Sequence, residues 1–207
     1  MAPPDRPLVA VLDYGIGNLR SAEKALQHVG ADARLTDDPD FVDDVAGVVL
    51  PGVGAFGRCM ESLRSAGLED VALGAIESGR PFLGICVGMQ MLFSGSDESP
   101  GVAGLRRFPG AIRWLPDTEK RPQMQWNRLR LRRPSPLLDG LEEEPWVYFV
   151  HSLAPEDSDA TVATCDYGGE VVAMVADSNV SAMQFHPEKS GANGLAILAN
   201  WVRGLAA

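Results

Sequence analysis

A cysteine between two glycines is the strongest candidate for chemistry in this sequence. Gly84, Cys86 and Gly88 form the pattern Gly-x-Cys-x-Gly at the end of a short apolar run. With serine at its centre, this pattern marks a sharp turn from a strand into a helix that exposes the central side chain. The glycines let strand and helix approach closely, and the free N–H groups at the helix start favour a thiolate. The pattern predicts a nucleophilic thiol at Cys86; the alternative is a buried core cysteine.

A histidine and a glutamate late in the chain can complete such a site. His186 ends an apolar run and is followed by Pro187 and Glu188. In extended backbone, residues i and i+2 project to the same side, so Glu188 can reach the His186 ring and orient it. The other ring nitrogen then faces the thiol as a base, which completes a nucleophile, a base and an orienting acid. His151 is interpreted as a structural or pocket-lining residue rather than a second base.

A glycine-rich loop is a third candidate for the site. Residues 51–57 contain three glycines and directly follow the buried apolar run at residues 48–50. A loop at the C-terminal end of a strand can place backbone N–H groups beside a reacting centre. A tight turn without a further role explains the glycines equally well at this point.

The elements that must position these residues follow from the hydrophobic pattern. The first half repeats apolar strands and amphipathic helices, which predicts an α/β fold with a mostly parallel central sheet and helices on both faces. The second half has strand-like segments separated by turns, so we expect antiparallel strands added to that sheet. A single domain spanning residues 1–207 is expected. Strands are predicted at 8–12, 31–35, 48–50, 112–115, 129–132, 146–150, 161–165, 171–175 and 181–185, and helices at 19–29, 37–45, 58–66, 68–78 and 195–205.

Composition narrows the class of protein. The chain has 207 residues, of which 45% are hydrophobic and 22% charged, which is typical of a globular domain. No apolar run approaches the ~20 residues of a membrane span, and the sequence shows no signal peptide. We therefore expect a cytoplasmic protein that does not bind a membrane. Three cysteines without metal-type spacing indicate neither a disulfide framework nor a metal site. A net charge of −10 opposes nucleic-acid binding, and residues 128–133 alternate arginine with leucine as a half-exposed strand would.

Five motifs together resemble a known family. They lie at residues 13–21, 51–57, 84–90, 148–152 and 184–190. The sequence is similar to the class I, or triad, glutamine amidotransferases, and within them to the glutaminase subunits of imidazole glycerol phosphate synthase, which serves histidine biosynthesis. The cysteine and His-Pro-Glu motifs are shared by many amidotransferases, whereas the motifs at 13–21, 51–57 and 148–152 point to this subunit.

The resemblance implies a role for each matching residue. Cys86 would attack the side-chain amide of glutamine, His186 would pass a proton to the departing ammonia, and Glu188 would orient the imidazole. No cofactor or metal is implied. The backbone at Gly52, Val53 and Val87 would hold the oxyanion, and the peptide at Gly52 and Val53 would have to turn over before it can donate. Gln90, Glu98 and Ser152 would line the substrate pocket.

The resemblance also implies a protein partner. Similar subunits form a heterodimer with a TIM-barrel cyclase subunit, which receives the ammonia through its interior. Asn18, Trp126 and Lys189 would lie at that interface.

Three positions depart from the family pattern. Gln123 and Gln125 stand where relatives usually carry histidine and glycine, and Leu153 stands where a tyrosine is usual. Two alternatives stay open beside the leading hypothesis. One is an amidotransferase subunit of another synthase, because the cysteine motif and the triad would serve any ammonia acceptor. The other, which the three departures suggest, is a non-catalytic interaction subunit with a degenerate pocket.

Overall fold

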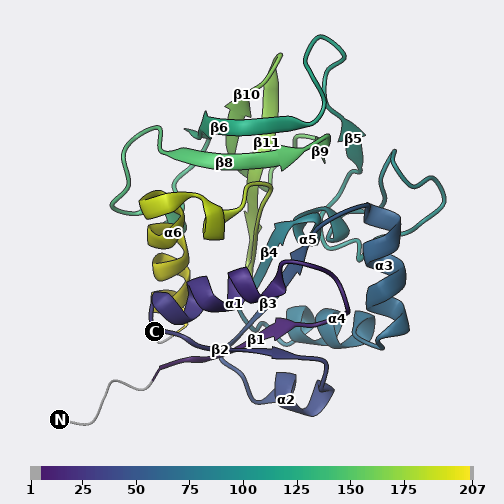
Figure 1. The fold of residues 1–207 in the computed structure, drawn as a ribbon, viewed down its shortest axis with the longest axis vertical. Helices are drawn as coiled ribbons and strands as arrows, with labels where there is room; N and C mark the ends of the chain where they lie inside the picture. Colours follow the sequence, from purple (N-terminus) through teal and green to yellow (C-terminus); the bar gives the residue numbers. More distant parts are fainter. Residues whose placement is uncertain (1–5, 206–207) are drawn as a thin grey trace.

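An eight-stranded sheet forms the centre of the molecule. The computed structural model describes residues 6–205, and the strands follow one another across the sheet in the order β2-β1-β3-β4-β12-β11-β10-β7 (Figure 1). The strands from β2 to β12 in this order are parallel, and the remaining three are antiparallel. This confirms the predicted α/β class with a mostly parallel sheet. The strands are β1 (Leu8–Leu12), β2 (Asp32–Thr36), β3 (Gly47–Gly52), β4 (Phe82–Cys86), β7 (Arg130–Leu131), β10 (Thr161–Asp166), β11 (Glu170–Asp177) and β12 (Val180–Met183).

Helices cover both faces of this sheet. Because crossovers between parallel strands are right-handed, the order of the strands places α1 on one face and α2, α3 and α4 on the other. Helix α6 packs against α1, and α2 packs against α4, in agreement with this division (Figure 1). The helices are α1 (Leu19–His28), α2 (Pro39–Asp43), α3 (Phe56–Ser65), α4 (Glu69–Glu77), α5 (Val87–Met91) and α6 (Gly191–Gly204), with short 3₁₀ turns η1 (Pro136–Leu138) and η2 (Pro187–Lys189).

The central strands bring the candidate site to one edge of the sheet. Every residue of β3 and β4 is buried, as expected for parallel strands covered on both faces. The two strands are in register so that Gly52, the last residue of β3, lies beside Cys86, the last residue of β4. Ligands of such sheets bind at the carboxyl ends of the strands. The fold therefore places the glycine-rich loop and the thiol side by side.

The second half of the chain differs from the prediction in two respects. Strand β12 runs parallel to β4 rather than antiparallel, and so continues the parallel part of the sheet. Two strand pairs stand apart from the main sheet, each as a two-stranded antiparallel sheet. They are β5 (Ile112–Trp114) with β9 (Leu153–Pro155), and β6 (Gln123–Arg128) with β8 (Trp146–His151).

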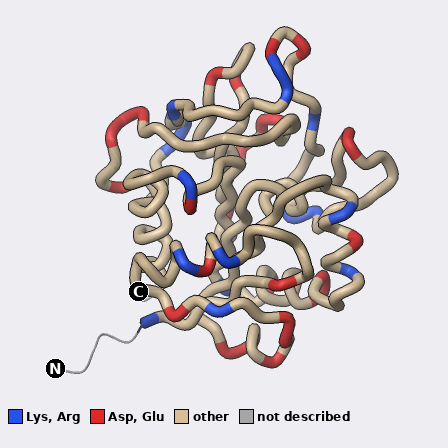
Figure 2. Tube along the Cα trace, in the orientation of Figure 1, with Lys and Arg blue, Asp and Glu red and all other residues tan. Residues whose placement is uncertain are grey.

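The arginine-rich run at 128–133 contributes less strand than expected, because only β7 belongs to the sheet. Its charges are offset by carboxylates: Arg128 pairs with Glu144, Arg130 with Glu144 and Asp166, and Arg132 with Asp157 and Glu170. Figure 2 shows basic and acidic residues interspersed along the trace. Among residues 6–205, no helix combines the length and the apolar character needed to cross a bilayer.

Candidate active site

The backbone at Cys86 is strained in the way the sequence pattern predicts. Cys86 ends β4 and precedes α5, with φ 56° and ψ −113°, a region that residues with a side chain rarely adopt. The glycines around it allow close approach. A Cβ on Gly88 would overlap the carbonyl oxygen of Leu50, and a Cβ on Gly84 would lie 3.1 Å from the Ala182 Cβ. The strand-to-helix turn therefore depends on both glycines of the motif.

His186 and Glu188 lie together, but for a different reason from the one expected. The Nδ1 atom of His186 is 2.8 Å from Oε1 of Glu188. The connecting backbone is not extended; Pro187, Glu188 and Lys189 form the 3₁₀ turn η2. The predicted pairing holds because this tight turn folds the carboxylate back onto the ring. The Glu188 side chain is 2% exposed, so the pair is shielded from water.

Asn18 joins this pair from the other end of the chain. Its Nδ2 donates to Oε1 of Glu188 at 3.1 Å, so one carboxylate oxygen serves both the imidazole and the Asn18 amide. Asn18 has a left-handed backbone, φ 67°, at the start of α1. The family resemblance implies an interface role for Asn18, and in the structure its side chain contacts Glu188 of the candidate triad.

The charge state of His186 depends on its neighbours. Burial alone would lower its pKa. Hydrogen bonding to Cys86 and Glu188, reinforced by their negative charges, outweighs burial and raises the pKa of His186 to about 10. The ring therefore carries a second proton at neutral pH. An imidazolium beside a sulfur favours the thiolate, which is the nucleophilic form of cysteine.

A cavity of about 320 Å³ lies beside Cys86 and His186. Cys86 and His186 line it together with all three predicted substrate-pocket residues, Gln90, Glu98 and Ser152. Glu98 has a second contact, since its Oε2 accepts a hydrogen bond from the Phe56 backbone at 2.8 Å and so completes the start of α3. The remaining lining residues are Val53, Gly54, Val87, Pro122, Val150, His151 and Leu153.

The three residues expected to hold an oxyanion are close together. Val53 and Val87 line the cavity, and a Cβ on Gly52 would come within 3 Å of the backbone of Val87. Two donors that the sequence analysis did not single out hold this segment. Tyr14 Oη donates to the Pro51 carbonyl at 2.5 Å, and Cys59 Sγ donates to the Val53 carbonyl at 3.3 Å. Neither could be found from the sequence, because both partners are backbone oxygens.

A buried polar group lies on the other side of the cavity. His151 Nδ1 is 2.8 Å from the Leu153 carbonyl, and its Nε2 is 2.9 Å from Oε1 of Gln123. A neutral imidazole carries one N–H and so donates to one of these two oxygens. Gln123 also contacts the Cys165 thiol at 3.8 Å. Burial lowers the pKa of His151 to about 4, so the ring is neutral at pH 7. The departure at Gln123 is thus built into a hydrogen-bonded network.

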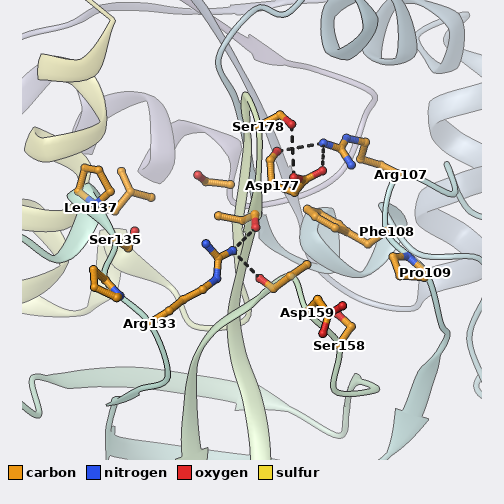
Figure 3. A pocket seen from close by; sticks show the side chains of 15 residues that line it. Arg107, Phe108, Pro109, Arg133, Ser135, Leu137, Ser158, Asp159, Asp177 and Ser178 are labelled. Carbon is orange, nitrogen blue, oxygen red and sulfur yellow. Dashed lines mark hydrogen bonds and ion pairs between the residues drawn. The ribbon is translucent and has the colours of Figure 1, made fainter.

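The largest cavity described, of about 860 Å³, lies elsewhere (Figure 3). Its basic side chains are already engaged: Arg107 pairs with Asp177 at 2.7 Å, and Arg133 donates to the carbonyls of Ala160 and Thr161. No cysteine or histidine lines it. The smaller cavity at Cys86 is therefore the one equipped for nucleophilic chemistry.

The remaining predicted interface residues lie on the surface near His186. Trp126, on β6, is 47% exposed, stands edge-on to Tyr148 and passes beside Gly191 at the start of α6. Lys189 is exposed in η2, directly after Glu188. An exposed aromatic and an exposed cation thus flank the turn that carries the triad carboxylate.

Comparison with known proteins agrees with this geometry. The family model for glutamine amidotransferase class-I matches residues 10–205. Imidazole glycerol phosphate synthase subunit HisH of Methanothermobacter thermautotrophicus is 50% identical, covering 94% of this chain and 98% of the relative. The same-named subunit of Deinococcus radiodurans is 48% identical, covering 97% of this chain and 95% of the relative.

Solved structures share the fold at lower identity. A crystal structure titled glutamine amidotransferase has a TM-score of 0.75 at 18% identity, covering 96% of this chain and 99% of that one. PurLQS from Thermotoga maritima also gives 0.75, at 21% identity, over 97% of this chain and 99% of that one. The family match and the identities over nearly whole chains lead to one conclusion: this chain belongs to the class-I glutamine amidotransferases, in the group of imidazole glycerol phosphate synthase subunits HisH.

Proposed function

We propose that this chain hydrolyses glutamine to glutamate and ammonia and delivers the ammonia to a cyclase subunit of imidazole glycerol phosphate synthase. The observation that supports it most is the arrangement of Cys86, His186 and Glu188: a strained cysteine at a strand end, beside a buried histidine that a carboxylate orients at 2.8 Å. The HisH relatives support the substrate and the synthase.

The first half of the proposed reaction forms a thioester. The Cys86 sulfur attacks the side-chain carbonyl carbon of glutamine, and the carbonyl oxygen becomes an oxyanion. The N–H groups of Val87 and Val53 are the proposed donors to it, since both residues line the cavity. His186 then gives its proton to the amide nitrogen, the carbon–nitrogen bond breaks, and ammonia leaves.

The second half releases glutamate. A water molecule attacks the thioester while His186 takes one of its protons, and the carbon–sulfur bond breaks to regenerate the thiolate and the protonated imidazole. Glu188 holds the ring in place through both halves, and its burial keeps that contact from being replaced by water. Gln90, Glu98 and Ser152 are proposed to bind the amino-acid end of glutamine, since all three line the same cavity.

The proposed partner face surrounds the triad. Asn18 contacts Glu188, while Trp126 and Lys189 are exposed beside it. A cyclase subunit docked there would meet the site where ammonia is formed. The heterodimer and a cytoplasmic location are part of this proposal.

The decisive experiment measures glutamate release by the pure chain, alone and mixed with a cyclase subunit of imidazole glycerol phosphate synthase and its nucleotide substrate. A large rise on mixing is expected. High activity without the partner would favour a free-standing glutaminase. No glutamate release in either condition would favour a non-catalytic subunit or a different synthase.

The matched variant is Cys86→Ala. Glutamine-dependent turnover is expected to fall by at least ~10³-fold, because no nucleophile remains. Binding to the cyclase and cyclase activity with added ammonium salts are expected to stay at the wild-type level. Retained glutamine turnover in this variant would exclude the triad assignment.

A further inference from the structure

A buried amide faces the Cys86 sulfur from the neighbouring strand. Gln184 directly follows β12. Met183, the last residue of β12, lies beside Ile85 of β4. The residues that follow each of them, Gln184 and Cys86, are therefore neighbours at the carboxyl edge of the sheet. The Gln184 side chain is fully buried. Its Nε2 is 3.7 Å from the Cys86 Sγ, within the range of a hydrogen bond to sulfur.

A chain of contacts fixes which end of this amide meets the sulfur. Gln90 Nε2 is 3.2 Å from the Leu153 carbonyl, which can only accept, so this atom must be the amide nitrogen. The same nitrogen is 3.0 Å from Gln184 Oε1, which must therefore be the acceptor. Turning the Gln184 amide over would set two N–H₂ groups against each other. The Leu153 carbonyl thus fixes the Gln90 amide, and Gln90 in turn aims the Gln184 N–H at the sulfur.

We infer that Gln184 is a catalytic residue that donates a hydrogen bond to the Cys86 thiolate, and that Gln90 is the positioning residue that orients it. Gln184 and His186 are two residues apart in the same buried segment, and Gln184 contacts this sulfur. Both N–H groups of Gln90 are used in this arrangement, so its Oε1 is the atom left for a ligand in the cavity. This inference rests on the proposed nucleophilic role of Cys86.

The donor acts on the balance between thiol and thiolate. A hydrogen bond to a charged acceptor stabilises the charged form of that acceptor. When such a hydrogen bond is buried and its donor is removed, no water molecule takes the donor's place. Once the sulfur is acylated it becomes a weaker acceptor. The Gln184 N–H therefore favours the free thiolate and eases its return when the thioester is hydrolysed.

The test measures the rate at which iodoacetamide alkylates Cys86 as a function of pH, followed by mass spectrometry of the peptide that contains Cys86. Burial raises the pKa of both Cys59 and Cys165 to about 11, so these thiols react slowly in the same range. The readout requires no glutamine. It therefore reports on the sulfur even in a preparation that fails to hydrolyse glutamine.

The variant is Gln184→Met, which keeps the length of the side chain and removes the donor. The midpoint of its alkylation profile is expected to rise by about one pH unit, with an alkylation rate at neutral pH about tenfold lower than wild type. Gln90→Met, which removes only the orienting contact, is expected to shift the midpoint in the same direction by less. Should Gln184→Met fail to fold, the Gln90→Met profile decides the question.

Asn200→Leu is the matched control. Asn200 is a buried amide on α6 that donates to the carbonyls of Leu137 and Asp139, remote from the sulfur. The substitution removes these two hydrogen bonds and the one that Asn200 accepts from Arg203, and the midpoint is expected to stay at the wild-type value. Wild-type midpoints in folded Gln184→Met and Gln90→Met would overturn the inference, as would an equal shift in Asn200→Leu. A shifted midpoint in protein that does not hydrolyse glutamine would support the inference and count against the proposed function.

Discussion

At the scale of single residues, two buried donors hold the backbone on either side of the Gly52–Val53 peptide. Tyr14 binds the Pro51 carbonyl and Cys59 binds the Val53 carbonyl. Burial raises the pKa of the Tyr14 hydroxyl and raises that of the Cys59 thiol to about 11, so both groups keep their protons at neutral pH. The peptide between the two held carbonyls is the one expected to donate to the oxyanion. Its orientation therefore depends on both donors.

Tyr14→Phe tests this dependence. The variant removes the bond to the Pro51 carbonyl, and kcat for glutamine hydrolysis is expected to fall about tenfold with KM changed less than about twofold, because the loss concerns the transition state. Tyr167→Phe is the control, since Tyr167 makes the same hydroxyl-to-carbonyl contact, at 2.5 Å, with Lys120. Equal losses in both variants would assign the effect to general destabilisation.

His151 supplies a pH dependence of stability. Its pKa is about 4 in the folded protein and ordinarily about 6.5, so the unfolded chain binds more protons between these values. The stability contributed by neutral His151 is complete above pH 6.5 and is lost as the pH falls toward 4. Between pH 7.5 and 5.5, wild type is expected to lose about 1 kcal/mol more unfolding free energy than His151→Asn, measured by urea denaturation. Parallel pH profiles would show that His151 does not carry this titration.

The candidate site residues that lie in short motifs could be predicted from the sequence. Contacts of amide side chains with residues far away in the chain could not. Cys86 and His186 could be named because glycines and a proline mark their backbone. The bond from Asn18 to Glu188 joins residues 170 positions apart, and the Gln184 contact with Cys86 joins residues 98 apart. Such pairs depend on the strand order, which the amphipathic pattern leaves undetermined.

At the scale of elements, the turn from β4 into α5 depends on space that glycine leaves open. Leu50, in the middle of β3, presents its carbonyl oxygen where a Cβ of Gly88 would lie. Gly88 lies in α5, and the ladder between β3 and β4 keeps the Leu50 carbonyl from moving away from it. The elbow is thus held from the neighbouring strand as well as by its own residues.

Gly88→Ala is accordingly expected to destabilise the protein by at least about 3 kcal/mol and to abolish glutamine hydrolysis. Gly74→Ala is the control: Gly74 lies in α4, where an added Cβ would meet nothing within 4 Å. That variant is expected to gain about 0.5–1 kcal/mol from better helix propensity. Urea denaturation followed by circular dichroism measures both, and a Gly88→Ala protein as stable as wild type would contradict this account of the elbow.

Most elements of the first half were predictable because β1, β3 and β4 are apolar runs that alternate with segments of helical periodicity. The second half was harder. Strand β6 was not predicted, because its apolar and polar side chains are not arranged as in an ordinary half-buried strand. Met124 and Trp126 are exposed, whereas the polar Gln123 is buried. The parallel direction of β12 could not be read from its own residues, because direction depends on which strand lies beside it.

At the scale of the whole molecule, the exposed residues around the triad make a testable surface. Trp126 lies on β6 and is about half exposed, and its ring lies beside Gly191, which follows the turn that carries Glu188 and Lys189. Aromatic side chains that fill a partner's pocket dominate the binding energy of protein interfaces. The proposed heterodimer therefore depends on Trp126 for affinity more than for chemistry.

Trp126→Ala is expected to weaken binding to the cyclase subunit at least about tenfold, measured by titration calorimetry, because the lost contact is worth more than about 1.4 kcal/mol. At saturating cyclase, glutamine hydrolysis is expected to stay within about twofold of wild type, since Trp126 does not line the cavity at Cys86. Leu131→Ala is the control, an apolar side chain of similar exposure, 44%, on the outermost strand β7. Unchanged affinity in Trp126→Ala would show that the cyclase subunit binds another face. A loss of glutamine hydrolysis that saturating cyclase does not restore would show that Trp126 helps the cyclase subunit to activate the site.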